Sequence, residues 1–581
     1  MSTDFFFLFF LLFVGATLFL WLLGAAFSFQ LGGVRSFFHA PWIGFGLLVG
    51  ALQIAHLIAP IDRKFSIVFV ACALPVTLTT LLLRFSQRLR SARPISGSAW
   101  LLLLIAVALL TFIPVFNSCT KEMYRYDMGL YYLKTIRWIE SFPIVPGLAN
   151  VQDHLGFNQC AFLPASLFDS LTPDRWGLFL VGGILPWLGM TLSLFAILRL
   201  AIASLRHDKS AEAIEVAYAI SLPAWIFTFL TGDSSSASPD CISACLMLHT
   251  FLVFAGFALQ QDEERRAGLG EIMLLGSICL CVKLNSLGLV AGIWLSCAAI
   301  LWHRNEWRLL LQPCIGVMAA LSTIIVATWI GRGVVLSGYP FFPASAMPMP
   351  VAWRTPVARV DRCRTLIRGW ARDREDVARS LHGWHWLPNW YQRVAPEMTN
   401  RFTWPAQGGF AGLVVLAGFA TFAKPLRKNL RDFLFLVAPI LIYAIFWFIT
   451  APEPRYFGTT VWIFAMCPAL TFIGRGPRLG LTSSLANLSV SILPIFFSAW
   501  EFRWAWTRPE PRLPEVRVVE TAPVASLHGV LVWVPAAGDR TFDSPLPSSQ
   551  GPVPELALLN PTKGIAGGFK HMRIENQRQL P

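Results

Sequence analysis

Long apolar runs separated by short polar segments recur along most of the chain. Between residues 5 and 500 these runs are about 18 to 22 residues long, which is the length an α-helix needs to cross the hydrocarbon core of a bilayer. The pattern therefore predicts an all-α polytopic membrane protein with about 12–14 transmembrane helices. We expect the spans near residues 5–27, 42–60, 66–83, 98–116, 176–198, 213–231, 240–260, 270–284, 286–302, 309–330, 409–423, 432–450, 457–474 and 480–500.

Two long polar segments, residues 117–175 and 331–408, interrupt this pattern. In the first, apolar positions recur at helical spacing from Leu130 to Ile139, which predicts a helix lying along the membrane surface. In the second, apolar positions from Val360 to Trp370 recur at helical spacing with arginines between them, which predicts a basic amphipathic surface helix. Both segments are long enough to carry a functional site.

The distribution of charge orients the chain in the membrane. The formal net charge is +14, although only 14% of residues are charged and the mean hydropathy is +0.57. Basic residues gather in short loops around 84–93, 199–209 and 424–431, as the positive-inside bias produces for cytoplasmic loops. The segments 117–175 and 331–408 then lie on the extracytoplasmic side. Because no Lys/Arg-rich tail remains, we expect no nucleic-acid partner.

The chain divides by composition into three parts. Residues 1–97 are expected to form N-terminal transmembrane helices, and residues 98–500 a transmembrane core. Residues 501–581 are rich in proline and then give short β-like pieces such as GVLVWVP, which predicts a small extracytoplasmic tail. Cys119 and Cys160 flank the first polar segment and could form a disulfide if that segment faces an oxidising compartment, although two cysteines without geometry decide little.

Candidate chemistry collects on the side of the membrane where the two polar segments lie. Asp127 directly precedes the first surface helix, where an aspartate also serves as an N-cap. Three cations are expected at the same membrane surface, where they can bind a lipid phosphate or merely contact headgroups: Lys283, Arg332 and Arg455. Secondary or acceptor-binding candidates are Glu122, Asp153, His154, Asp233 and Asp240, the last of which also suits the first turn of a helix beginning at Pro239.

Several motifs in a fixed order carry a resemblance. The pieces YDMGLYYLKTIRWI, VPGLANVQDHLGFN, SPD, VKLNSL, RGVVLSGYPFFP and PEPRY, between about residues 98 and 475, are similar to a bacterial family of multi-span membrane proteins grouped with the GT-C class of integral-membrane glycosyltransferases. About three spans before residue 98 are extra relative to the GT-C core. Many sequences of this type read GLYH where this chain has Tyr132, which leaves the acceptor class open.

The resemblance implies a GT-C-like fold in the bacterial inner membrane with an extracytoplasmic active-site face. It further implies inverting transfer of a sugar from a polyprenyl-phosphate donor to a lipid, polysaccharide or protein, with Asp127 as the base on the acceptor hydroxyl. Lys283, Arg332 and Arg455 are the candidates for binding the donor phosphate.

Two other functions fit the same sequence features. One is a transporter or flippase of a lipid-linked sugar, and the other is a non-catalytic membrane subunit of the same fold. The sequence also leaves a divalent metal ion undecided, because such a site needs several converging oxygen ligands and only Asp127 is assigned with conviction. The expected partners are the lipid-linked donor and membrane lipids.

Overall fold

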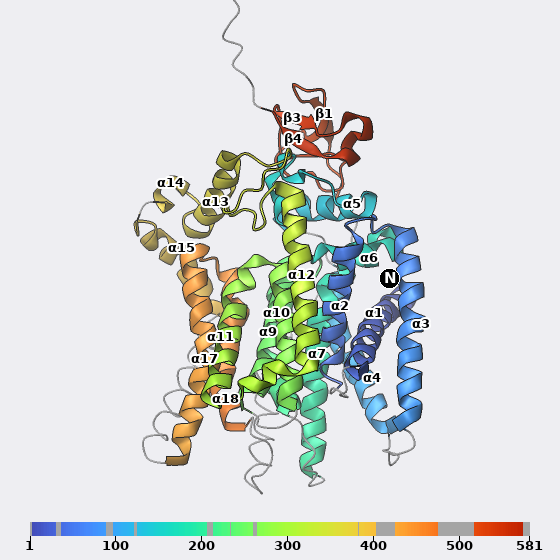
Figure 1. Ribbon diagram of the computed structural model, residues 1–581, viewed down its shortest axis with the longest axis vertical. Coiled ribbons are helices and arrows are strands. Elements are labelled where there is room, and N and C mark those ends of the chain that lie inside the picture. The colour runs from blue at the N-terminus through green and yellow to red at the C-terminus, as the bar shows by residue number, and fades with distance from the viewer. Residues whose placement is uncertain are drawn as a thin grey trace, which may run out of the picture.

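A bundle of long helices forms the body of the protein in a computed structural model (Figure 1). The structure describes residues 3–30, 37–88, 97–120, 125–205, 213–232, 234–259, 264–381, 383–401, 424–473 and 516–572. The long helices are α1 (Thr3–Gln30), α2 (Ala40–Ala55), α3 (Arg63–Arg88), α4 (Gly97–Cys119), α7 (Gly177–Leu205), α8 (Ala213–Gly232), α9 (Pro239–Leu259), α10 (Glu264–Val282), α11 (Leu287–His303), α12 (Pro313–Ser337), α17 (Lys424–Thr450) and α18 (Pro454–Ile473).

Within the described ranges, nine helices are long and apolar enough to cross a membrane. The prediction of a polytopic helical membrane protein is therefore confirmed. Two of the expected spans, 409–423 and 480–500, lie outside the described residues, so the predicted number of spans stays a prediction. Three further helical segments in the described residues are apolar but shorter than a typical span: Ala40–Ala55, Phe162–Leu171 and Gly268–Val282.

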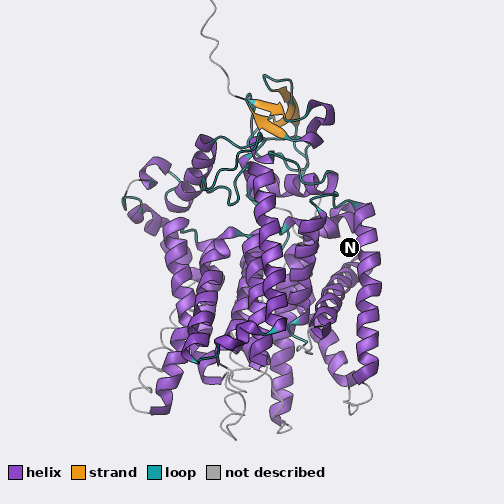
Figure 2. Ribbon diagram, in the orientation of Figure 1, coloured by secondary structure: helices purple, strands orange, loops and turns teal. Residues whose placement is uncertain are grey.

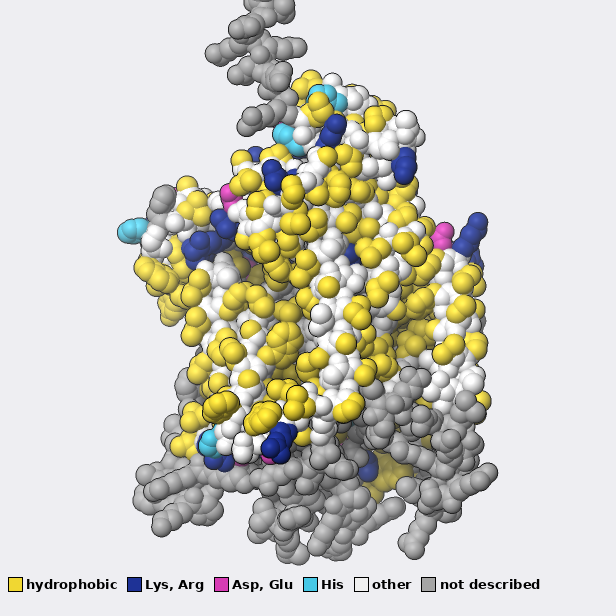
Figure 3. All heavy atoms as spheres, in the orientation of Figure 1, with side chains coloured by type: hydrophobic (Ala, Val, Ile, Leu, Met, Phe, Trp, Pro, Cys, Tyr) yellow, Lys and Arg dark blue, Asp and Glu magenta, His cyan; other side chains and the backbone are white. Residues whose placement is uncertain are grey.

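The burial of these helices separates the centre of the bundle from its edge. In α7, 94% of the most apolar stretch is buried in protein, against 11% in α3. The exposed apolar side chains of α3 suit contact with lipid, because a helix that is apolar all round needs an apolar surrounding. Figure 3 shows hydrophobic side chains covering the visible flank of the bundle, with charged side chains gathered toward its two ends.

The two polar segments lie together at one end of the bundle, which we call the loop end (Figure 1). The first segment forms a π-helical turn (Met128–Tyr132), α5 (Leu133–Ser141), the short turns Leu148–Asn150 and Asp153–Gly156, α6 (Phe162–Leu171) and the turn Pro173–Arg175. The second forms α13 (Val357–Arg372), α14 (Val377–Ser380) and α15 (Leu387–Arg401). The two predicted surface helices are thus confirmed as helices. The possible disulfide between Cys119 and Cys160 is not formed in the structure.

The tail, residues 516–572, lies on top of the first polar segment. Strands β1 (Thr521–Ala525) and β2 (Leu531–Pro535) pair antiparallel, as do β3 (Leu556–Leu558) and β4 (Phe569–His571), with a short 3₁₀ stretch Pro561–Gly567 between them. The strand expected in GVLVWVP is therefore confirmed. Figure 2 places these strands at the loop end, where Val532 and Phe569 share an apolar core with Trp138 of α5.

Candidate functional site

Asp127 stands at the start of the π-helical turn Met128–Tyr132, in the N-cap position. Its side chain makes no capping hydrogen bond, so N-capping does not account for this residue. Its Oδ2 atom instead lies 3.3 Å from Nη1 of Arg455, with 22% of the side chain exposed. The aspartate is thus held by a cation and remains reachable from solvent.

Two more predicted residues meet Arg455 at the same place. Asp240, in the first turn of α9, lies 4.0 Å from Nε of Arg455 and also forms an ion pair with Lys283. Lys283 follows the end of α10 in extended conformation, so the helix stops before the lysine and the side chain can turn toward α9. We call Asp127, Asp240, Lys283 and Arg455 the charged cluster.

Tyr456 supports both cations of the charged cluster. The Nζ atom of Lys283 lies 4.4 Å from the centre of its ring, and the guanidinium carbon of Arg455 lies 5.0 Å from it. Arg455 also donates a hydrogen bond of 3.0 Å from Nη2 to the Tyr456 hydroxyl. Cations above an aromatic face are attracted by the ring quadrupole, so this tyrosine fixes both side chains. The sequence signal was the PEPRY motif, which was noted for its arginine alone.

The walls beside Asp127 are aromatic and buried. Tyr131 and Tyr132 pack edge to face with ring centres 4.7 Å apart, and each is at most 5% exposed. Burial raises the pKa of both phenols well above the usual value, and the charge of Asp127 adds to the effect. Both hydroxyls therefore stay protonated near neutral pH and can act as hydrogen-bond donors.

The tail reaches the same site. The Tyr126 hydroxyl donates to the carboxylate of Asp539, and the guanidinium of Arg540 lies 5.2 Å from the Tyr126 ring centre. Burial and the hydrogen bond to Asp539 raise the pKa of Tyr126 to about 12. The carbonyl of Gly129 accepts hydrogen bonds from the backbone N–H groups of Thr541, at 3.0 Å, and Phe542, at 2.9 Å. Residues 539–542 therefore border the candidate site, which no sequence signal indicated.

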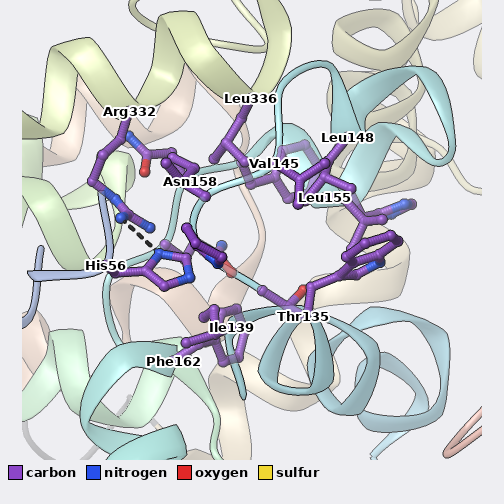
Figure 4. A pocket seen from close by; sticks show the side chains of 16 residues that line it. His56, Thr135, Ile139, Val145, Leu148, Leu155, Asn158, Phe162, Arg332 and Leu336 are labelled. Carbon is purple, nitrogen blue, oxygen red and sulfur yellow. Dashed lines mark hydrogen bonds between the residues drawn. The ribbon is translucent and has the colours of Figure 1, made fainter. Parts of the chain in front are cut away.

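Arg332 lies apart from the charged cluster. It is 4% exposed in α12 and donates hydrogen bonds to Nδ1 of His56 at 3.0 Å and to the carbonyl of Gln53 at 3.5 Å. Figure 4 shows this contact at the edge of a cavity whose volume is about 30 Å³. Such a space holds about one or two water molecules. The proposed role of Arg332 in binding phosphate stays a prediction.

The remaining predicted residues are scattered. Asp153 pairs with Nε of Arg359 of α13 at 2.5 Å. His154 lies against the Tyr131 ring, with ring centres 4.9 Å apart, and burial lowers its pKa. Glu122 and Asp233 lie outside the described residues.

A divalent metal at the charged cluster stays a prediction as well. In the described part of the chain, the two carboxylates of the cluster already face Lys283 and Arg455. A hard cation such as Mg²⁺ would have to compete with these side chains for its oxygen ligands.

Comparison with known proteins places the chain in a family. No curated protein and no solved structure matches it. A family model described as "Domain of unknown function (DUF8201)" matches residues 5–462, a range that includes all four residues of the charged cluster. Because this match covers well over half of the sequence, the chain belongs to the DUF8201 family.

Proposed function

We propose that the protein is an inverting glycosyltransferase that moves a sugar from a polyprenyl-phosphate donor to an acceptor hydroxyl at the loop end of the bundle. The observation that carries the proposal is the charged cluster itself. Its four residues come from four separate segments and combine a reachable carboxylate with two cations that an aromatic ring holds in place. GT-C-like architecture and an extracytoplasmic position for this site form part of the same proposal.

The reaction needs a base, and Asp127 is the candidate. Its carboxylate accepts the proton of the acceptor hydroxyl while that oxygen forms a bond to the anomeric carbon of the donor sugar. The bond between the anomeric carbon and the phosphate oxygen breaks with its electron pair, so the polyprenyl phosphate leaves and the configuration inverts. Attack from the side opposite the phosphate places the sugar between the carboxylate and the phosphate-binding cations, so Arg455 has to leave its 3.3 Å contact with Asp127 when the donor binds.

Arg455 and Lys283 are the candidates for the phosphate. The leaving phosphate gains a negative charge as the bond breaks, and fixed cations stabilise that developing charge. The Arg455 side chain is 40% exposed, so phosphate oxygens can reach its guanidinium and compete with its present partners. Lys283 is 14% exposed and already compensates the charge of Asp240. In the proposal it therefore stabilises the phosphate by its positive charge at longer range than Arg455 does.

The test uses membranes that contain the wild-type protein, Asp127→Asn or Asp361→Asn at equal protein levels. Asp361 is a matched control, because its carboxylate is 42% exposed on α13 and pairs only with surface groups in the described residues. Radiolabelled polyprenyl-phosphate sugars are supplied, and label transferred to another lipid or polymer is counted. Loss of a positioned base costs about 10²- to 10⁴-fold in rate, so we expect that decrease in Asp127→Asn and none in Asp361→Asn.

Two results would contradict the proposal. Equal transfer by wild type and Asp127→Asn removes Asp127 as the base. Transfer by none of the three proteins, across several sugars, removes the glycosyltransferase itself and favours a transporter or a non-catalytic subunit.

A further inference from the structure

A second group of ionisable side chains lies inside the helix bundle, away from the charged cluster. His39 precedes α2, His249 lies in the middle of α9, and Glu271 lies in α10. At 1.5 Å rise per residue, His249 is about 13 Å along α9 from Asp240. Polar groups at such depth are costly in a membrane protein and usually have a function.

The donor atoms of these residues converge on one point. One ring nitrogen of each histidine and one carboxylate oxygen of Glu271 all lie within 4.8 Å of one another. Nδ1 of His39 is 2.8 Å from Oε2 of Glu271, and Nε2 of His249 is 3.0 Å from Oε1. Tetrahedral Zn²⁺ with ligand bonds of about 2.0–2.1 Å keeps its donor atoms about 3.3 Å apart. To bind the ion, the Glu271 oxygens therefore need to move a few tenths of an ångström away from the two histidine nitrogens. The two histidine nitrogens need to move somewhat closer to each other.

The contacts of His249 fit a metal ligand. Its Nδ1 atom lies 2.7 Å from the hydroxyl of Tyr218 in α8, and its ring stacks on Trp42 with centres 4.6 Å apart. A histidine that ligates a metal through one nitrogen usually donates its other N–H to a neighbouring acceptor, which fixes the tautomer and the ring orientation. Tyr218 offers that acceptor, and Trp42 holds the plane of the ring.

His39 supplies an independent observation. Its Nδ1 atom is buried and makes no hydrogen bond of acceptable geometry within the described residues, although the Glu271 carboxylate is 2.8 Å away. A nitrogen and a carboxylate oxygen that lie close without hydrogen-bond alignment are placed to share a cation. The side chain of His39 is 15% exposed, so an ion can reach the site from that side.

We propose that His39, His249 and Glu271 bind one Zn²⁺ ion that ties α2 to α9 and α10. Two imidazole nitrogens and one carboxylate are ligands that zinc accepts, with a water in the fourth position, whereas Mg²⁺ and Ca²⁺ prefer oxygen ligands alone. The ion adds positive charge next to the carboxylate of Glu271, whose side chain is fully buried. The site is structural and takes no part in sugar transfer, since it lies about 13 Å along α9 from Asp240 of the charged cluster.

The test measures bound metal and thermal stability in the full-length protein, purified in detergent through an affinity tag without histidine. We expect about one zinc per chain in the wild type by elemental analysis, and a lower unfolding temperature after treatment with a zinc chelator. His39→Gln and Glu271→Gln should lose the zinc and the chelator effect. His303→Gln is the matched control, because this exposed histidine is the last residue of α11 and contacts Arg431 instead of the proposed site. Tyr218→Phe should weaken zinc binding about 10- to 100-fold.

Two results would overturn the proposal. One is a wild-type protein that holds no zinc even after incubation with Zn²⁺. The other is equal zinc in the wild type, His39→Gln and Glu271→Gln. If the variants fold too poorly to purify, Co²⁺ added to the wild-type protein decides instead. Intense visible absorption from a four-coordinate site supports the proposal, and its absence refutes it.

Discussion

The contact between Gly129 and the tail predicts that Gly129→Ala will release residues 516–572 from the loop end. A β-carbon at Gly129 would lie 2.6, 2.7 and 2.8 Å from three ring atoms of Phe542. Phe542 is 2% exposed, and its N–H donates to the carbonyl of Gly129, so the ring cannot simply turn away. The added methyl group therefore displaces this part of the tail.

The magnitude follows from three contributions. Overpacking a well-packed contact costs about 1–3 kcal/mol. Each of the two hydrogen bonds to the Gly129 carbonyl contributes about 0.5–1.5 kcal/mol if displacement breaks it. Alanine gains about 0.5–1 kcal/mol over glycine in a helical turn, which opposes these costs. At the low ends of these ranges the net loss of docking free energy is about 1 kcal/mol, which is about fivefold in the population of undocked tail.

Limited proteolysis of the purified protein measures that population, because cleavage of an exposed segment follows its open fraction when reclosing is fast. Gly129→Ala should raise the rate of cleavage in the tail by at least about fivefold. Gly551→Ala is the control, because a β-carbon there meets no atom within 4 Å. In a Phe542→Ala background, the ring is absent and Gly129→Ala should add almost nothing. A tail in Gly129→Ala that resists protease as in the wild type would refute the reasoning.

Two buried titratable groups at the loop end predict opposite changes of stability with pH. Burial lowers the pKa of Lys134 to about 7, so between pH 7 and its ordinary value of 10.5 only the unfolded chain holds the proton, and this residue makes stability rise by about 1.4 kcal/mol per pH unit. Denaturation over a pH series should show that rise in the wild type and lose it in Lys134→Met; identical profiles would contradict the buried amine. Burial and the neighbouring Asp169 raise the pKa of Glu140, so above its ordinary value of 4.5 the folded state holds the extra proton and stability falls as pH rises toward the raised pKa. The same measurement should give a flatter profile for Glu140→Gln, and an unchanged slope would show that Glu140 titrates normally.

The sequence predicts where the helices of this protein lie along the chain far better than it predicts which helices pack against one another. Apolar runs locate the long helices, and the spacing of apolar residues from Leu130 to Ile139 locates α5, because burial against lipid or protein requires those periods. Lateral packing in a membrane depends on close contacts of small residues and on shape, which the periods do not encode. The close approach of α1 and α2 is an example, since a β-carbon at Gly24 would lie 1.8 Å from the carbonyl oxygen of Ala40.

The candidate site shows the same division. Each of the four side chains of the charged cluster was predicted separately as a candidate. Their contact with one another was not predicted, because Asp127 and Arg455 are 328 residues apart in the sequence. The contact of Tyr126 with Asp539 spans 413 residues and joins the loop to a tail that the sequence marks only as different in composition. Tyr456 was missed because an aromatic residue near a membrane surface is ordinarily part of an interfacial belt. Only the fold puts its ring beneath two cations.

The ion pair of Lys283 and the two ion pairs of Arg455 differ in a way that bears on the proposed reaction. Lys283 and Asp240 are each 14% exposed and in direct contact, so separating them leaves a buried charge without compensation. Arg455 is 40% exposed and lies 3.3 Å from Asp127 and 4.0 Å from Asp240, distances at which an ion pair near solvent is weak. An arriving phosphate therefore draws Arg455 first and leaves the tighter pair intact. In the proposed reaction, binding of the donor loosens the hold of Arg455 on Asp127, and the carboxylate becomes available to the acceptor hydroxyl only once the sugar is in place.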